Sequence, residues 1–169
     1  MQNFRYARPQ VAVHWVAALV IVFLLLSGMF VLEDMPNTVE KIGNLRIHMI
    51  FGALAGLLVI TRIAMRRRLP APPSLPGDKL AHAGHMSLNL AILLMAASGM
   101  LLALQSGALD AVIGNGVLPE NFKDFTPRKV HGLVAKIAMG LIVLHVAAAL
   151  YHQLIVKDGL ISRMRLGGR

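Results

Sequence analysis

Two histidines, His131 and His145, lie fourteen residues apart within a largely apolar run. At about 100° per residue, fourteen steps come within roughly 40° of four full helical turns, so both imidazoles leave the same side of a helix, about 21 Å apart along its axis. Ala135 and Ala138 stand between them on that face and leave room beside the helix. Because an imidazole inside a membrane is a sign of function, this spacing suggests axial ligands for two flat cofactors.

Composition places these histidines in a membrane protein. Of the 169 residues, 56% are hydrophobic and 15% are charged, whereas a soluble domain carries roughly 25% charge. Several apolar runs reach the roughly 20 residues that cross a bilayer. They predict helices at about 11–32, 47–65, 82–105 and 130–156, with a short surface helix in the 106–129 loop. We expect an all-α fold, an integral membrane bundle of four transmembrane helices, as a single membrane domain over residues 1–169.

The absence of cysteine limits the redox chemistry of the chain. It excludes disulfides, iron–sulfur clusters, thiolate ligation of haem and covalent c-type haem attachment. Histidine and methionine remain as ligands for haem iron, with seven of the first and ten of the second. The methionines are scattered through the apolar runs, which favours a packing role for them.

The basic residues gather on one side of the predicted membrane topology. The N-terminus, the 66–81 loop with Arg62 and the tail from Lys157 hold eleven Lys and Arg against Asp78 and Asp158. The other two loops and the adjoining helix starts hold six basic and six acidic residues. The positive-inside rule therefore places both termini in the cytoplasm. The net charge of +9 is then a topology signal, aided by anionic lipid, and we expect no nucleic-acid partner.

This topology sorts the histidines into two depths. The outer level holds His48 and His131, and the inner level holds His14, His85, His145 and His152. The simplest pairing joins His48 with His131 and His14 with His145, each pair binding one six-coordinate b haem. His85 or His152 in place of His145 is the open alternative. Iron with two imidazole ligands has no free position, which favours electron transfer over oxygen binding.

Two further features near His48 have more than one interpretation. Gly52 and Gly56 follow His48 on one helix face, where they form either a small-residue packing motif or a bare surface against which a porphyrin lies. Arg62 shares that face at the opposite depth, and it contacts a haem propionate, a quinone head or the lipid headgroups. His82 and His85, one turn apart, form only a weak metal-binding pattern.

The same residues resemble the bacterial cytochrome b561 family of small dihaem membrane proteins over nearly the whole chain. The matching motifs are His14-Trp15, His48 with Gly52, Ala81 to His85, and His131 to His152. Val130 departs from the family pattern, which has Trp there, and Gln153 stands where some members have His; neither is a proposed iron ligand. The resemblance implies two b haems, a bacterial inner-membrane location and electron exchange with ubiquinone.

One branch of that family resembles a superoxide oxidase, which passes electrons from periplasmic superoxide to ubiquinone. An anionic substrate suits the cations that flank the outer pair, namely Arg46, Lys123, Arg128 and Lys129, because positive charge steers anions. The alternative is that nearby acids cancel this charge. For the quinone side, the expected residues are Arg62, Lys79, His85 and His152, since quinone reduction needs proton donors.

Two other functions stay open at this point. A haem subunit would pass electrons from a partner dehydrogenase or hydrogenase to quinone, and the short loops argue mildly against so large a partner. A histidine-rich metal transporter or a structural bundle would carry carboxylates inside its spans. Neither 47–65 nor 130–156 contains a carboxylate.

Overall fold

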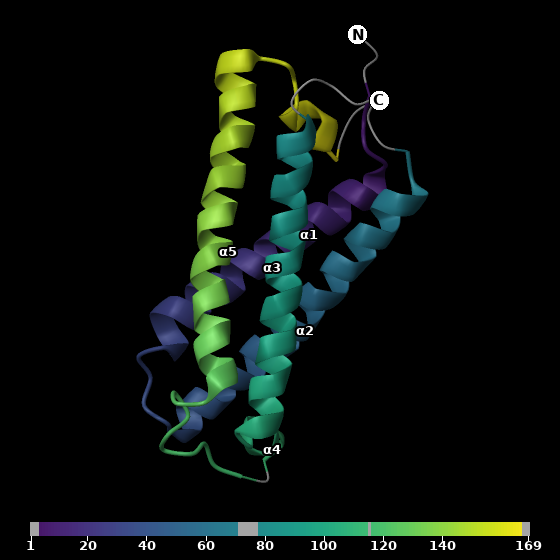
Figure 1. Ribbon diagram of the computed structural model, residues 1–169. Helices are drawn as coiled ribbons and strands as arrows, with labels where there is room; N and C mark the ends of the chain where they lie inside the picture. Colours follow the sequence, from purple (N-terminus) through teal and green to yellow (C-terminus); the bar gives the residue numbers. More distant parts are fainter. Residues whose placement is uncertain (1–3, 71–77, 115, 167–169) are drawn as a thin grey trace.

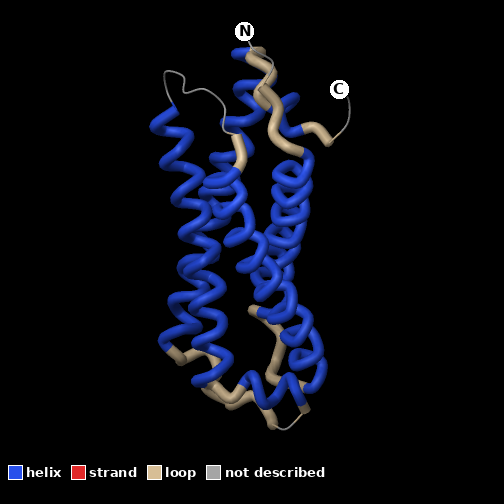
Figure 2. Tube along the Cα trace, turned by 90° about the vertical axis from the view of Figure 1, so that its right-hand side faces the viewer, coloured by secondary structure: helices blue, strands red, loops and turns tan. Residues whose placement is uncertain are grey.

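The computed structural model describes residues 4–70, 78–114 and 116–166, and all regular structure within these ranges is helical (Figure 2). The long helices are α1 (Arg8–Ser27), α2 (Val39–Arg68), α3 (Asp78–Gln105) and α5 (Thr126–Tyr151). Two π-helical turns, η1 (Gly28–Leu32) and η2 (His152–Val156), extend α1 and α5. Two short helices complete the fold, α4 (Ala108–Ile113) and η3 (Ile161–Met164).

The four predicted membrane spans are confirmed. The spans Arg8–Leu32, Val39–Arg68, Lys79–Gln105 and Thr126–Val156 are each long and apolar enough to cross a bilayer. The prediction placed the start of the second helix at residue 47, about two turns late, because the segment before it is polar. Lys41 in that segment is buried, and its ammonium donates to the Met35 carbonyl (2.7 Å) and to Asn37 Oδ1 (3.1 Å). These bonds satisfy the buried ammonium, so the polar segment before residue 47 can form the first turns of α2.

The short helix expected in the 106–129 loop is also present. It is α4, and it begins after Gly107 and ends before Gly114, which have φ values of 72° and 100°. Side chains with a Cβ rarely adopt this left-handed conformation. The two glycines therefore define both ends of a helix only six residues long.

The long helices form two pairs, α1 with α2 and α3 with α5, and contacts between α2 and α3 join the pairs. Figure 1 shows α3 and α5 side by side, with α1 and α2 crossing behind them at an angle. At one end, called the terminal end here, the Tyr6 N–H donates to the Arg163 carbonyl (3.3 Å) and Trp15 Nε1 donates to the Met164 carbonyl (3.0 Å). The opposite end holds α4 and is called the α4 end.

The middle of the bundle is closed by small and branched residues. Ala138 of α5 is completely buried in a cluster with Val59, Ala91 and Ile92. The expectation that Ala135 and Ala138 leave room beside the helix is therefore wrong for Ala138, because its small side chain is covered where α3 packs against α5. Large apolar residues such as Leu19 and Leu144 are exposed on the outside, as contact with lipid requires.

Candidate haem sites

At the α4 end, the structure brings His48 of α2 and His131 of α5 together. Their ring centroids lie 6.3 Å apart, and the planes meet at 69°. A metal–nitrogen bond to imidazole is about 2 Å long, so two imidazoles on opposite sides of one iron have centres roughly 6 Å apart. The spacing of this pair therefore fits a six-coordinate haem iron between the rings.

Two glycines from neighbouring helices lie behind these rings. A Cβ added to Gly28 in η1 would lie 3.3 Å from His48 Cε1, and one added to Gly99 in α3 would lie 3.2 Å from His131 Cε1. Both distances are tighter than ordinary van der Waals contact, so a larger residue would displace the ring. Gly28 and Gly99 were not predicted from the sequence.

The sequence does contain a signal for these glycines. Both stand in the tripeptide Ser-Gly-Met, at 27–29 and at 98–100. Gly28 follows His14 by fourteen residues, and Gly99 follows His85 by the same interval. The helices α1 and α3 therefore repeat one pattern, in which a histidine near the terminal end is followed by a glycine beside the outer imidazoles.

The glycines of α2 divide between the two interpretations offered above. A Cβ on Gly52, one turn after His48, would meet nothing within 4 Å, whereas one on Gly56 would lie 3.2 Å from the Ala96 Cβ of α3. Gly56 thus serves helix packing. Gly52 leaves the open surface beside His48 that a flat macrocycle needs.

At the terminal end, two imidazoles lie beside that of His145 of α5. The His14 ring of α1 lies 6.4 Å from it, nearly the separation of the other pair, and the His85 ring of α3 lies 5.2 Å from it. His14 Nδ1 is buried without a hydrogen-bond partner among the described residues. The separation of His14 from His145 fits two ligands of one iron, whereas the separation of His85 from His145 is too short for that geometry.

Arg62 of α2 is the cation of this terminal-end site. Its charge acts on His14, His85 and His145, and its side chain is half-buried. Among the described residues it forms no ion pair. A half-buried guanidinium without a carboxylate suits an anionic or carbonyl group of a bound molecule, such as a haem propionate or a quinone.

The other histidines of the terminal end have different partners. His152 Nδ1 lies 2.6 Å from Asp158 Oδ2, and this hydrogen bond lowers the pKa of Asp158 below its ordinary value. His82 Nδ1 accepts from Arg66 Nη2 (3.2 Å), and Lys79 is exposed at the start of α3. Across the described ranges, no group of three metal-ligating side chains forms a metal site, so the His82–His85 pattern has no support.

The cations predicted around the outer pair divide into two kinds. Arg128 and Lys123 both pair with Glu33, the latter at 3.5 Å. Although burial raises the pKa of Glu33, the charges of Arg128 and Lys123 outweigh that effect and hold the pKa below its ordinary value. Arg46 Nε donates to the neutral Val112 carbonyl (2.6 Å) and Lys129 is exposed, so these two cations are not cancelled by that carboxylate.

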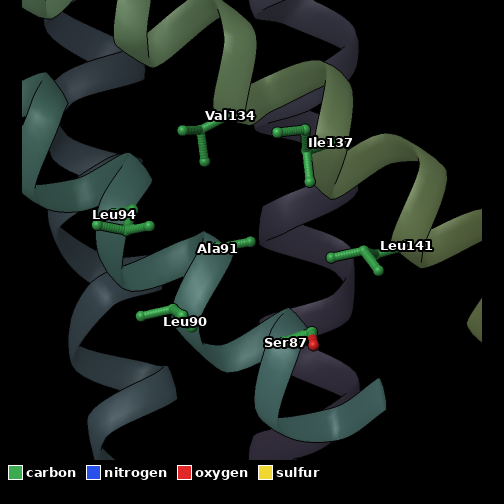
Figure 3. A pocket seen from close by; sticks show the side chains of 7 residues that line it. All are labelled: Ser87, Leu90, Ala91, Leu94, Val134, Ile137 and Leu141. Atoms are coloured by element: carbon green, nitrogen blue, oxygen red, sulfur yellow. The ribbon is translucent and has the colours of Figure 1, made fainter. Parts of the chain in front are cut away.

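A separate hollow on the outside of the bundle is not a haem site. It lies between α3 and α5 and is lined by Ser87, Leu90, Ala91, Leu94, Val134, Ile137 and Leu141 (Figure 3). Its wall contains no histidine, and Ser87 is its one polar side chain. Its α5 residues lie on a flank of the helix beside the face that carries His131 and His145.

A membrane bundle with paired imidazoles at two depths defines the class of membrane-bound b-type cytochromes. The sequence profile of prokaryotic cytochrome b561 matches residues 5–167. The chain belongs to this family of haem-binding, electron-transferring membrane proteins.

Three relatives match along almost their whole length. A probable superoxide oxidase CybB of Yersinia pestis is 27% identical, with 95% of each chain covered. A cytochrome b562 of Cereibacter sphaeroides is 29% identical, with 94% of each chain covered. The cytochrome b561 homolog 2 of Escherichia coli is 28% identical, covering 95% of this chain and 90% of the relative. The resemblance inferred from the histidine motifs is thereby confirmed.

Proposed function

We propose that the protein carries electrons across the bacterial inner membrane, from superoxide on the outer side to ubiquinone on the inner side. His48 and His131 would hold one b haem, and His14 and His145 a second. When bound, the haems supply one-electron transfer between the two faces. The observation that carries this proposal is the matched ring separation at the two ends, 6.3 Å and 6.4 Å.

The α4 end is the outer face in this proposal, and both termini are cytoplasmic. The charge distribution supports this orientation, because the basic excess lies at the terminal end. At the α4 end, Arg46 and Lys129 supply positive charge that steers an anion toward His48 and His131. Arg128 adds to this charge, because Glu33 can neutralise only one of its two partners Arg128 and Lys123, and the charge of Arg128 acts directly on both imidazoles. Because His48 and His131 would both bind the iron of the haem held there, the protein would have only to bring superoxide close, and each superoxide would leave as O2 after losing one electron.

The terminal end must supply protons as well as a binding site. Two electrons and two protons convert ubiquinone to ubiquinol, so two superoxide molecules are consumed for each quinone. Arg62 would hold a quinone carbonyl, and His85, on which the charge of Arg62 acts, would donate a proton. His152, oriented by Asp158, and the exposed Lys79 connect this region to the cytoplasm.

Stopped-flow mixing of the oxidised, haem-loaded protein with superoxide tests this function. We expect the b-type α-band to rise at a rate proportional to superoxide concentration and to be abolished by superoxide dismutase. Ubiquinol should then form at half the number of superoxide molecules consumed. Haem that stays oxidised on mixing would contradict the proposal and favour a haem subunit that receives electrons from a dehydrogenase or hydrogenase.

The relatives lend this proposal partial support. One relative is described as a probable superoxide oxidase and two as cytochromes b562 and b561. At 27–29% identity, these names support membrane electron transfer more strongly than they support a particular electron donor. The stopped-flow experiment is therefore the deciding one.

A further inference from the structure

Ser98 of α3 is a buried hydroxyl that contacts the imidazole of His131. Ser98 Oγ lies 2.7 Å from the Leu94 carbonyl, 3.1 Å from the Met95 carbonyl and 3.1 Å from His131 Nδ1. The serine itself is only 8% exposed. A hydroxyl has one hydrogen to donate, and the shortest contact directs that hydrogen to Leu94. The lone pairs of Ser98 Oγ are therefore available to accept from the histidine.

The proton on His131 can be located from the partners of Ser98. The carbonyls of Leu94 and Met95 can only accept, so one of them takes the single hydrogen of the Ser98 hydroxyl. The ring nitrogen that contacts Ser98 Oγ must then carry hydrogen. Nδ1–H thus faces Ser98 of α3, and the lone pair resides on Nε2.

From this geometry we infer that Ser98 is a positioning residue for His131. It fixes the tautomer and the ring orientation that leave Nε2 free to bind iron between His131 and His48. Gly99, the next residue, gives the ring the space to approach α3. This inference rests on the haem site proposed above, and it assigns to α3 a role in a site whose two imidazoles come from α2 and α5.

Ser27, the equivalent serine of α1, forms no such bond with the imidazole of His48. Ser27, in the first Ser-Gly-Met tripeptide, donates to the Leu24 carbonyl at 3.3 Å. His48 Nδ1, beside Gly28, is buried without a hydrogen-bond partner among the described residues. One iron would therefore have two unlike ligands. A hydrogen bond from the far ring nitrogen makes an imidazole a more basic ligand, so His131 should be the stronger donor.

The test compares Ser98→Ala with Ser98→Thr in the haem-loaded protein. A more basic ligand stabilises ferric iron, so loss of the bond should raise the midpoint potential of one haem. Outer-shell partners of metal-binding histidines typically change metal affinity by 10- to 100-fold. A tenfold shift toward the reduced form is about 59 mV for a one-electron couple. Ser98→Thr keeps a hydroxyl that bonds the same helix turn and should restore the original potential.

Ser106→Ala is the matched control. Ser106 follows the end of the same helix, is 7% exposed and donates to the Leu102 carbonyl at 2.7 Å, as Ser98 does to Leu94. Its backbone and hydroxyl contacts are local, so both haem potentials should stay unchanged. Ser27→Ala should likewise leave both potentials unchanged. The low-spin ferric electron paramagnetic resonance signal of one haem should shift only in Ser98→Ala.

Unshifted potentials and signals in Ser98→Ala, with both haems retained, would overturn the inference, as would an equal shift in Ser106→Ala. If Ser98→Ala loses one haem while Ser106→Ala keeps two, the bond is required for ligation and the inference stands. If Ser98→Ala loses both, Ser98→Thr decides: two haems with original potentials support the role, and fewer overturn it. His131→Ala separates the two proposals, because retention of both haems there contradicts the haem site itself.

Discussion

Gly99 lies directly behind the ring of His131, where an added Cβ would be 3.2 Å from Cε1 and 3.4 Å from Nδ1. Gly28 has the same relation to His48 at 3.3 Å. In each case, a helix that contributes no imidazole at the α4 end approaches the histidine of a neighbour through a glycine. The orientation of both rings is therefore set by all four long helices.

Gly99→Ala should disturb the haem held at the α4 end. The added methyl group must displace the His131 ring, and overpacking of this kind costs about 1–3 kcal/mol. We expect one of two haems to be lost or to change its low-spin spectrum. Gly43→Ala is the control, since a Cβ there meets nothing within 4 Å. Haem per chain, measured as the pyridine haemochrome, checks the result, and equal haem content with unchanged spectra in both variants would contradict it.

Gly52→Leu tests the space beside His48. A Cβ at Gly52 meets nothing within 4 Å, so the chain alone should tolerate the change. If a haem fills this space, leucine should exclude it, and haem content should fall from two per chain to one. Gly43→Leu, on the same helix outside the site, should retain two. A Gly52→Leu protein with two haems would place the macrocycle elsewhere.

The sequence was sufficient to predict the number of spans and the gathering of histidines at both ends of the bundle. Long apolar runs reveal spans because the bilayer demands them, and the helical period gives the helix face on which each histidine lies. The orientation derived from Lys and Arg stays a prediction. The start of α2 at Val39 was missed because its first turns are polar, and the bonds that bury Lys41 run to Met35 and Asn37 in the segment just before the helix. Hydrophobic periodicity does not reveal such contacts.

The supporting residues of the site could not be predicted for a similar reason. Ser98 looks like any serine that bonds its own helix, and only the docking of α5 on α3 brings it to His131. The repeated Ser-Gly-Met tripeptide was a usable signal that periodicity did not identify. The closure of the mid-bundle core around Ala138 depends on the crossing of three helices, which the spacing of His131 and His145 does not specify.

Glu33 should make the stability of the α4 end depend on pH. Its pKa is held below the ordinary value, against the effect of burial, by Arg128 and Lys123. The carboxylate therefore contributes stability above its unfolded pKa, about 4.3, and this contribution is lost as pH falls through the lower folded pKa. Because Glu33 is 45% exposed, screening limits the effect to about 1 kcal/mol or less.

Thermal unfolding of Glu33→Gln checks this expectation. The variant should melt slightly below the wild type at neutral pH, and the difference should vanish in acid and shrink in high salt. Glu120→Gln, an exposed carboxylate of the α4–α5 loop, is the control. A difference that grows as the pH falls would have the wrong sign and would refute the assignment.

Arg128→Gln should slow the reaction with superoxide more than Lys129→Gln does. The charge of Arg128 acts on both His48 and His131, and its side chain is only 19% exposed. Lys129 is exposed and its charge is screened by solvent. Steering by a charged cleft changes association rates by 10-fold or more, so we expect roughly a tenfold loss at low salt for Arg128→Gln.

Two comparisons test whether this loss is electrostatic. Removal of Arg128 also leaves the negative charge of Glu33 balanced by Lys123 alone, so the Glu33→Gln, Arg128→Gln double variant should recover part of the rate. The rates of wild type and Arg128→Gln should converge as the ionic strength rises. Equal rates for Arg128→Gln and Lys129→Gln at low salt would remove Arg128 from the approach of the anion.

His14→Ala and His85→Ala should differ in the number of haems that the protein retains. The ring of His14 lies 6.4 Å from that of His145, as two ligands of one iron require, whereas His85 lies 5.2 Å away. We therefore expect His14→Ala to retain one haem per chain and His85→Ala to retain two. His85→Ala should keep rapid haem reduction by superoxide but slow ubiquinol formation, because the proton donor is lost. The reverse pattern of haem content would make His85 the ligand and His14 the neighbouring base, because the two imidazoles beside His145 would have exchanged roles.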